Sequence, residues 1–249
     1  MKRILIAAAA ALLVSTAPVL SASITPEQKK EIEQIVRSYL LENPDILREM
    51  SAKLQEQEQV AEDSARGDAL TKNADAVFRT EGDPVVGNPK GDVTLVEFFD
   101  YNCSWCKRSV GEVISLTEQD KNLKIIMKEF PIFGENSEYA ARAAIASERQ
   151  GKYWEFHQAL FKHEGQVTAD VTDQLAETVG LDVAKLKADM QDPKVTERLA
   201  ANRQLGQSLL INGTPAFIID DQVVPGFMEL SGLQAAIAQV REGGGCKLC

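Results

Sequence analysis

A stretch near the middle of the chain, residues 93–108, constrains the fold most strongly because it combines a strand pattern, a turn and two cysteines three positions apart. Residues 93–99 are apolar and rich in β-branched and aromatic side chains, which predicts a buried strand. Polar turn residues follow, and Cys103-Ser-Trp-Cys106 then opens a helix. Unpaired N–H groups and partial positive charge at a helix N-terminus stabilise a thiolate better than a neutral thiol. The stretch therefore predicts a strand, a turn and a helix that begins with a reactive thiol.

Cys103 is predicted to be the reactive sulfur because it comes first on the helix. In Cys-x-x-Cys motifs the pKa of the nucleophile can fall to roughly 3.5–7.5 from a free value of about 8.5. Cys106, one turn further along, is placed to resolve a mixed disulfide. The alternatives are an inert disulfide or half of a zinc site, but zinc sites usually combine two such motifs about 15–20 residues apart, and no second pair lies near. We therefore expect a redox-active Cys103–Cys106 disulfide, with no metal and no other cofactor at this site.

The first 22 residues have the pattern of a secretory signal peptide. Basic residues precede an apolar run, 4–14, that is too short to span a bilayer comfortably, and small residues lead to an expected cleavage site after Ala22. The expected localisation is a Gram-negative periplasm. Four cysteines are too few to brace a chain of 249 residues, which can build a full core without them. The cysteines are therefore predicted to be chemical rather than structural.

The charge balance disfavours nucleic acid as a partner. Without Lys2 and Arg3, the 27 basic residues fall to 25 against 37 acidic residues, a formal charge of −12. Such a surface repels phosphate backbones and anionic membranes.

Residues 23–79 are predicted to form a separate helical segment. Apolar side chains at helical spacing mark one face in each of two helices, which begin near residues 26 and 45. Two short amphipathic helices cannot bury their apolar faces alone. They either fold back on the catalytic domain as an arm or pack against other copies of the chain. We favour the second alternative, which gives a homo-oligomer, either a trimer or a dimer.

The remaining pattern predicts an α/β domain over residues 80–241. A second apolar strand is expected at 123–129, parallel to the first because a helix connects the two. An all-helical insertion is expected at about 135–209, followed by a β-hairpin at 214–226 and a closing helix. This order is that of a thioredoxin fold with an inserted all-helical domain. The last residues, 242–249, are expected to form a flexible Gly/Cys tail.

The strand, the Cys-x-x-Cys helix, the insertion and a Thr-Pro pair before the hairpin together resemble the DsbA-type thiol-disulfide oxidoreductases of the bacterial periplasm, over roughly residues 83–241. With the N-terminal segment, the chain is similar to the group of suppressor-of-copper-sensitivity protein C, in which a DsbA-like domain is carried on a dimerising or trimerising region. The resemblance implies cysteine-containing periplasmic proteins as substrates and a membrane thiol-redox partner. It also implies that Cys103 is the nucleophile and Cys106 the resolving cysteine, while Ser104 and Trp105 tune the redox potential and contact the substrate.

Glu97 lies inside the predicted buried strand, where a carboxylate is costly unless it is paired or stays neutral with a raised pKa. It precedes Cys103 by six residues, and the resemblance implies that it accepts a proton from the resolving cysteine. The alternative is that Glu97 lies at an exposed strand end and pairs with a lysine. We favour the catalytic role.

Thr214 and Pro215 directly precede the last hairpin. From the residues alone, Pro215 is an ordinary trans proline at the start of a strand. The resemblance instead implies a cis-proline that faces Cys103, with the Thr214 backbone free to pair with an extended substrate segment. Threonine before this proline resembles the disulfide isomerases, whereas strong oxidases more often carry valine.

Cys246 and Cys249 follow three glycines at the end of the chain, and the resemblance does not extend to them. They could form a local disulfide, exchange with the Cys103–Cys106 pair, or bind Cu(I) through soft thiolates, which makes them the weak metal candidates of the chain. A dispensable tail is an equal alternative.

These patterns predict a periplasmic thiol-disulfide oxidoreductase that acts as a protein disulfide isomerase. The Thr-Pro pair and the oligomerising segment both favour isomerisation, because an isomerase must hold a misfolded chain while it reshuffles disulfides. The nearest alternative is a DsbA-like disulfide oxidase whose N-terminal helices play no part. An alternative of another class is a copper-binding or copper-tolerance protein that uses the terminal cysteines.

Overall fold

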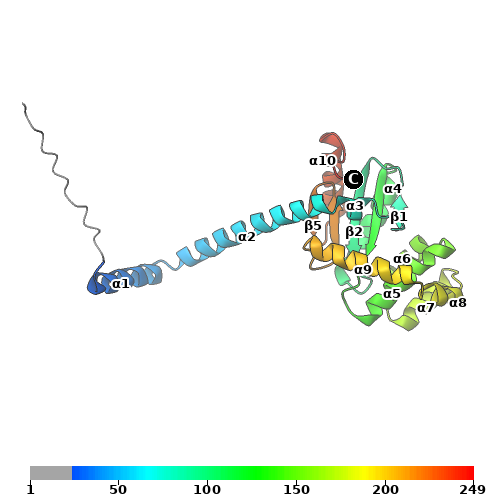
Figure 1. Ribbon diagram of the computed structural model, residues 1–249, viewed down its shortest axis with the longest axis horizontal. Helices are drawn as coiled ribbons and strands as arrows, with labels where there is room; N and C mark the ends of the chain where they lie inside the picture. Colours follow the sequence, from blue (N-terminus) through cyan, green and yellow to red (C-terminus); the bar gives the residue numbers. More distant parts are fainter. Residues whose placement is uncertain (1–23) are drawn as a thin grey trace, which may run out of the picture. The chain divides into compact units, whose positions relative to one another are not determined.

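The computed structural model describes residues 24–249, so the predicted signal peptide, residues 1–22, lies outside the described residues. The chain divides into two compact units, of which the first ends at Gln57 and the second covers Glu58–Cys249. Within the described range, none of the helices is both long and apolar enough to cross a membrane. Figure 1 shows the elements of both units.

The first unit consists of helix α1 (Pro26–Glu42) and the start of helix α2 (Asp45–Lys72). Thr25 begins α1 with a capping box, in which its hydroxyl accepts from the Gln28 N–H and the Gln28 side chain accepts from the Thr25 N–H. The apolar faces predicted for these helices are present, and they are exposed in the single chain. Their largest exposed members are Ile32, Ile35, Val36, Tyr39, Leu40, Leu47, Met50 and Leu54.

A five-stranded sheet forms the centre of the second unit, in the order β1-β3-β2-β4-β5. The strands are β1 (Val85–Gly87), β2 (Val93–Phe99), β3 (Leu123–Glu129), β4 (Ala216–Ile219) and β5 (Gln222–Pro225). Strands β2 and β3 run parallel, as predicted from the helix that connects them, and the other neighbours are antiparallel. Every residue of β2 is buried, because helices cover both faces of the sheet at this position.

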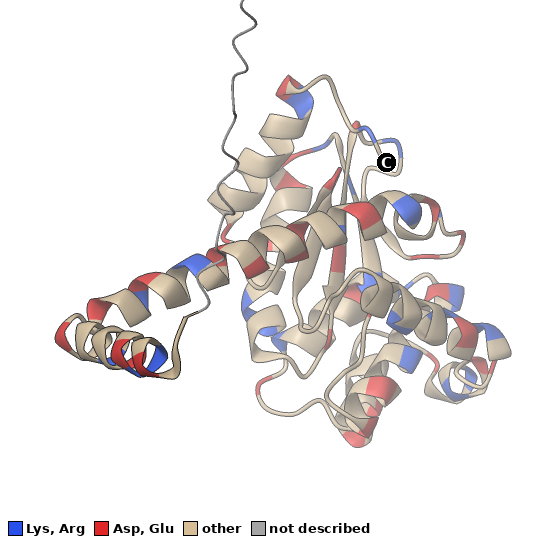
Figure 2. Cartoon of the chain, turned by 60° about the vertical axis from the view of Figure 1, so that its left-hand side comes forward, with Lys and Arg blue, Asp and Glu red and all other residues tan. Residues whose placement is uncertain are grey.

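An all-helical insertion separates β3 from β4, as predicted. It consists of α5 (Glu135–Ser147), the 3-10 turn η1 (Glu148–Gln150), α6 (Tyr153–Lys162), α7 (Ala169–Thr178), α8 (Val183–Asp189) and α9 (Pro193–Ser208). The alanines of α5 are buried because this helix contacts α6, α7, α8 and α9, and small side chains allow close approach. Figure 2 shows acidic and basic residues interspersed along the helices. The element order is that of the predicted α/β thioredoxin fold with a helical insertion.

Successive side chains of β2 point to opposite faces of the sheet and so belong to two apolar cores. The odd-numbered residues Leu95 and Phe99 lie in the core shared with α4 (Ser104–Gln119) and α10 (Leu230–Glu242). The even-numbered residues lie in the second core, with α9, the end of α2 and α3 (Ala74–Phe78). The helix that carries the cysteine pair therefore rests on the odd-numbered face.

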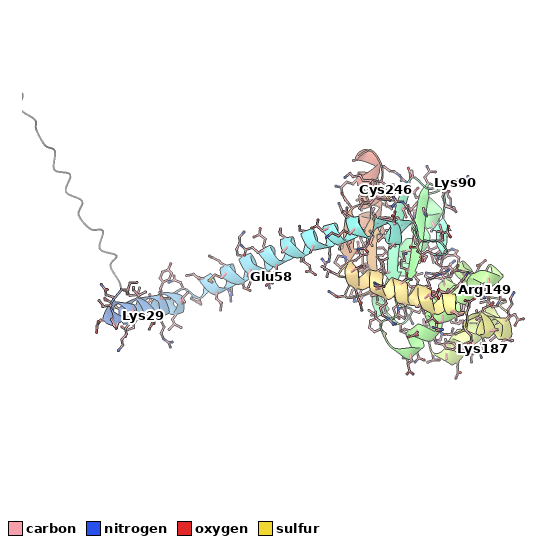
Figure 3. All side chains as sticks on the ribbon, in the orientation of Figure 1. Lys29, Glu58, Lys90, Arg149, Lys187 and Cys246 are labelled. Carbon is pink, nitrogen blue, oxygen red and sulfur yellow. A yellow bond between two sulfur atoms is a disulfide. The ribbon has the colours of Figure 1, made fainter. Side chains whose placement is uncertain are left out.

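The compact unit begins earlier than the predicted domain boundary at residue 80. Leu70, Val77 and Phe78 are fully buried in the even-numbered core, so the end of α2 and all of α3 belong with the sheet. Glu58, which is labelled on α2 in Figure 3, marks the start of this unit. The polar composition around these few apolar side chains concealed their role in the core.

A buried ion pair joins this part of the chain to the sheet. The Lys128 ammonium on β3 pairs with the Asp83 carboxylate and donates to Ala76 O at 2.8 Å. Burial raises the pKa of Asp83 and lowers the pKa of Lys128, while the attraction between the two charges opposes both shifts. The two side chains are 2% and 1% exposed, so each charge depends on the other.

Lys128→Met should destabilise the folded chain by about 3–5 kcal/mol, because it leaves the Asp83 carboxylate buried without its partner. The double variant that adds Asp83→Asn should recover part of the loss. Urea unfolding followed by tryptophan fluorescence measures both free energies. A loss of less than about 1 kcal/mol in the single variant, as an exposed pair gives, would contradict a desolvated ion pair.

Candidate active site

Cys103 is the N-cap of helix α4, directly before the first helical residue, Ser104. Its backbone is extended, with φ −78° and ψ 121°, so the chain enters the helix at this sulfur and the unpaired N–H groups of the first turn lie beside it. Cys103 and Cys106 are both free, and they are 4% and 1% exposed. The structure thus places both cysteines of the predicted active-site pair, as free thiols, at the start of the helix.

The peptide bond between Thr214 and Pro215 is cis, and it faces Cys103. The Cys103 thiol donates to Thr214 O, with 3.1 Å between the sulfur and the oxygen. The segment is held there because β4 follows it directly and pairs with β2. The Gly226 N–H also donates to Pro215 O at 2.9 Å. The residues alone predicted a trans bond here. Only the resemblance predicted the cis bond that the structure has.

These surroundings lower the pKa of Cys103 to about 6. The largest cause is a hydrogen bond from the Cys106 thiol, while burial opposes it and the N–H groups of Cys106 and Trp105 add to it. Burial raises the pKa of Cys106, and its hydrogen bond to Cys103 and the charge of Glu97 raise it further. Cys103 is therefore largely a thiolate at neutral pH, while Cys106 stays protonated and donates to it.

Glu97 is buried in the middle of β2, on the odd-numbered face that α4 covers. It is 3% exposed, and its neighbours on the adjacent strands are Met127 and Phe217. Burial raises the pKa of Glu97 to about 8, and the charge of Cys103 adds to the shift. The alternative of an exposed strand end paired with a lysine is wrong, because Glu97 lies in the middle of β2 and its carboxyl group is buried.

Asp100 holds the active-site turn in place, although the sequence pattern indicated only a turn residue there. Its carboxylate is 1% exposed and accepts four hydrogen bonds. The donors are Asn102 N (2.7 Å), Ser137 Oγ (2.7 Å), Ile132 N (2.7 Å) and Phe133 N (3.1 Å). These donors offset the cost of burying the charge and fasten the cysteine turn to the start of the insertion.

Asn102 and Lys107 connect the cysteine turn to the loop between α6 and α7, in the middle of the same insertion. The Asn102 side chain donates to Val167 O at 3.1 Å and accepts from the Val167 N–H at 2.8 Å. Lys107 donates to His163 O at 3.0 Å and to Gly165 O. The partners lie 65 and 56 residues away in the sequence, so no local pattern could have revealed them.

Ser104 and Trp105 lie exposed beside the reactive sulfur. The Trp105 side chain is 52% exposed, and its ring centroid lies 5.8 Å from that of Phe227. The Arg108 guanidinium lies over both rings, 5.4 Å and 4.9 Å from their centroids. An exposed apolar surface at this position suits contact with an unfolded polypeptide. Sequence reasoning singled out Ser104 and Trp105 but missed Phe227 and Arg108.

The C-terminal cysteines do not join this site. Cys246 and Cys249 are bonded to each other, and Leu248 and Cys249 pack against the even-numbered core instead of forming the predicted flexible tail. The Asp220 carboxylate and both sulfurs lie within 4.8 Å of one another. Since the sulfurs are joined in a disulfide, binding of a soft metal by this pair stays a prediction for its reduced form.

Two family models match the chain. The DSBA-like thioredoxin domain covers residues 94–238, which is more than half of the chain. The Copper resistance protein ScsC N-terminal domain covers residues 28–61, where the exposed apolar faces of α1 and α2 lie.

Solved structures of similar fold include a thioredoxin-like oxidoreductase from Silicibacter pomeroyi, which is 46% identical. The match has a TM-score of 0.66 and covers 68% of this chain and 97% of that one. A linker-deletion mutant of ScsC from Proteus mirabilis is 26% identical, with a TM-score of 0.68, and the match covers 90% of this chain and 99% of that one. These similarities confirm the predicted thioredoxin fold with its N-terminal segment.

Among curated proteins, Disulfide bond formation protein D from Bacillus subtilis is 25% identical over 175 residues, which are 66% of this chain and 79% of that protein. The chain also matches Na(+)/H(+) antiporter NhaA 1 from Salinispora arenicola, at 26% identity over 163 residues, and spans about a quarter of that protein's length. Since the family model spans the domain that carries the cysteine pair, the chain belongs to the DsbA-like thioredoxin-domain family of thiol-disulfide oxidoreductases, as the sequence resemblance predicted.

Proposed function

We propose that this chain is a periplasmic protein disulfide isomerase that acts on cysteine-containing proteins. The observation that carries the proposal is the position of Cys103, whose sulfur lies at a helix N-terminus and faces a cis-proline. With a pKa of about 6, this thiol is largely ionised at neutral pH. Such a thiolate is an effective nucleophile toward substrate disulfides.

Catalysis begins when the Cys103 thiolate attacks one sulfur of a substrate disulfide. A bond forms between Cys103 Sγ and that sulfur, and the other substrate sulfur leaves as a thiolate. Thr214 O, which accepts from Cys103 only while that thiol is protonated, is then available to a backbone N–H of an extended substrate. The freed substrate thiolate attacks a different substrate disulfide, and a substrate thiolate finally displaces Cys103, so that no net electrons are transferred.

Cys106 and Glu97 release substrates whose rearrangement stalls. Cys106 attacks Cys103 Sγ, which frees the substrate and leaves a Cys103–Cys106 disulfide. Because the pKa of Cys106 is raised, this step needs a proton acceptor, and the ionised fraction of Glu97, whose pKa is about 8, supplies one. An external dithiol must then reduce the pair again, and we assign this role to a membrane thiol-redox partner.

The first unit supports isomerisation more than simple oxidation. Its helices expose large apolar side chains and match the ScsC N-terminal domain, and we propose that they join copies of the chain into a dimer or trimer. Several reduced sites in one assembly raise the effective concentration of thiolate around a bound misfolded chain. A DsbA-like oxidase, the alternative, would use the same pair in its oxidised form and would not need the assembly.

Glu97→Gln should stabilise the folded chain increasingly as the pH rises from about 4.5 to 8. The pKa of Glu97 is about 8 in the folded chain against a model value of 4.5, so the folded state keeps a proton that the unfolded state loses, and the parent loses stability across this range. The gain at pH 8 should reach roughly 3–5 kcal/mol by urea unfolding. Glu118→Gln, on the exposed side of α4, is the control. A gain that does not change with pH would contradict a buried, protonated Glu97.

A second prediction concerns the apolar face of α1. Ile32→Glu combined with Tyr39→Glu should dissociate the assembly and lower the rate of reactivation of a scrambled-disulfide protein by at least about tenfold, because the sites no longer act together. Oxidation of a small dithiol should be unchanged. Light scattering measures the assembly, and regain of substrate activity measures isomerisation.

The matched control is Gln34→Glu combined with Ser38→Glu, which adds the same charge on the opposite side of α1 and should change neither measurement. If the dissociated variant still reactivates the scrambled protein at the parent rate, isomerisation does not require the assembly. If the parent oxidises reduced substrate but never reactivates the scrambled form, the chain is an oxidase.

A further inference from the structure

The disulfide between Cys246 and Cys249 lies at the end of the sheet opposite the active site. Cys249 Sγ is 3.9 Å from Thr94 O, at the beginning of β2, whereas Cys103 follows the end of this strand at Phe99. Five strand residues at about 3.3 Å each separate the two ends by roughly 17 Å. The terminal pair therefore cannot exchange with the active-site cysteines of its own chain while it stays docked.

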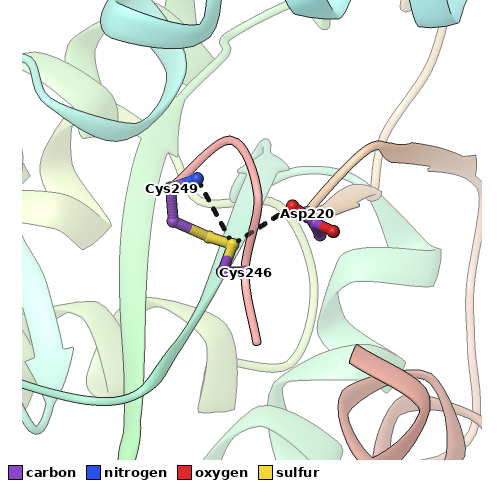
Figure 4. Close-up of side chains that lie close together, drawn as sticks. All are labelled: Asp220, Cys246 and Cys249. Atoms are coloured by element: carbon purple, nitrogen blue, oxygen red, sulfur yellow. Dashed lines mark hydrogen bonds between the residues drawn. A yellow bond between two sulfur atoms is a disulfide. The ribbon is translucent and has the colours of Figure 1, made fainter. Parts of the chain in front are cut away.

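Asp220 fixes the turn that carries the disulfide (Figure 4). This carboxylate is 3% exposed, and its Oδ1 accepts from the N–H groups of Lys247 (2.6 Å) and Leu248 (2.9 Å). Cys246 Sγ lies 3.4 Å from the same oxygen. The Cys249 N–H donates to Cys246 Sγ at 3.3 Å, a contact that favours negative charge on this sulfur when the disulfide opens.

The terminal turn is also docked by its side chains. Leu248 and Cys249 pack against the even-numbered core, and Arg79 Nη2 donates to Leu248 O at 2.8 Å. Cys246 and Cys249 remain partly exposed, so both sulfurs belong to a fixed part of the surface that other molecules can approach.

Stabilisation of the fold accounts poorly for this disulfide. It joins residues only 3 apart, and the entropic gain from a crosslink is smallest for the shortest loops. The contacts of Asp220, Leu248 and Arg79 already fasten the turn without it. Two cysteines with two residues between them have the spacing of exchange-active pairs, which leaves a chemical role as the better explanation.

We propose that the Cys246–Cys249 disulfide is a second redox-active centre, which accepts two electrons from thiols of other molecules, at a place apart from the Cys103 site. The proposal does not depend on the isomerase function, because it concerns different sulfurs at the other end of the sheet.

The exchange is balanced in two steps. A thiolate of the donor attacks Cys246 Sγ, the disulfide breaks, and Cys249 leaves as a thiolate. A second donor thiolate then attacks the donor sulfur of the mixed disulfide and releases Cys246 as a thiolate, aided by the Cys249 N–H. The donor thiols become a disulfide, the terminal pair becomes a dithiol, and the two donor protons pass to Cys246 and Cys249. The reduced Cys246 thiol donates to Asp220 Oδ1.

Asp220 acts as a positioning residue in this centre. Its contacts with the Lys247 and Leu248 N–H groups favour the closed turn, and its negative charge beside Cys246 disfavours a thiolate there. Both effects favour the disulfide, so removal of the charge should make the pair easier to reduce.

The test uses the full chain with Cys103→Ser and Cys106→Ser, so that only the terminal pair can react. The folded protein is equilibrated in buffers of reduced and oxidised glutathione, and free thiols are counted by mass after alkylation. We expect two thiols per chain to appear together, with half reduction inside the range that glutathione covers. Structural disulfides resist reduction by glutathione, so a pair that stays oxidised throughout the range would overturn the proposal.

Asp220→Asn in the same background should shift the equilibrium about tenfold toward the dithiol, which equals about 30 mV for two electrons. Asp221→Asn is the matched control, because Asp221 is an exposed neighbour that contacts only the Lys247 side chain among the tail residues, at 3.3 Å, and it should shift nothing. If the two variants shift the disulfide–dithiol equilibrium equally, Asp220 has no specific positioning role.

Discussion

The reactivity of this chain depends on keeping one buried sulfur negatively charged. Burial opposes charge, so the Cys103 thiolate depends on the Cys106 thiol and the first-turn N–H groups of α4, which lower its pKa. The same burial keeps Cys106 protonated, so one environment produces two thiols of opposite character. The attacking sulfur and the resolving sulfur are distinguished by position on the helix and not by residue type.

The rest of the second unit serves to place these donors. Pairing of β4 with β2 brings the cis-proline segment against Cys103, and the buried carboxylate of Asp100 connects the cysteine turn to the insertion at Ile132 and Ser137. The helical insertion is therefore attached to the catalytic turn itself and not only to the sheet. This arrangement explains how a long insertion can lie between β3 and β4 without disturbing the geometry of the site.

Local signals predicted most of the fold and both catalytic cysteines. The apolar run before Cys103 and the helix-forming composition after residue 135 need no distant partner to be recognised, and burial of Glu97 followed from its place in the strand. Most of the contacts that were missed depend on residues far apart in the sequence. Asp100 takes three of its four donors from the segment after β3 and from α5, and Phe227 approaches Trp105 only when the hairpin folds. A few buried side chains also place the end of α2 and α3 in the compact unit that begins at Glu58. Such contacts leave no periodic pattern, so only the folded chain reveals them.

The charge state of Cys103 is tested most directly by the rate at which iodoacetamide alkylates this cysteine in the reduced full chain, measured by mass between pH 4 and 9. Because only the thiolate reacts, we predict a midpoint near pH 6. We also predict that Cys106→Ala raises the midpoint, since the Cys106 thiol is the largest source of stabilisation. A midpoint near the free-thiol value of about 8.5, or one that Cys106→Ala leaves unchanged, would contradict the claim that these donors hold Cys103 as a thiolate.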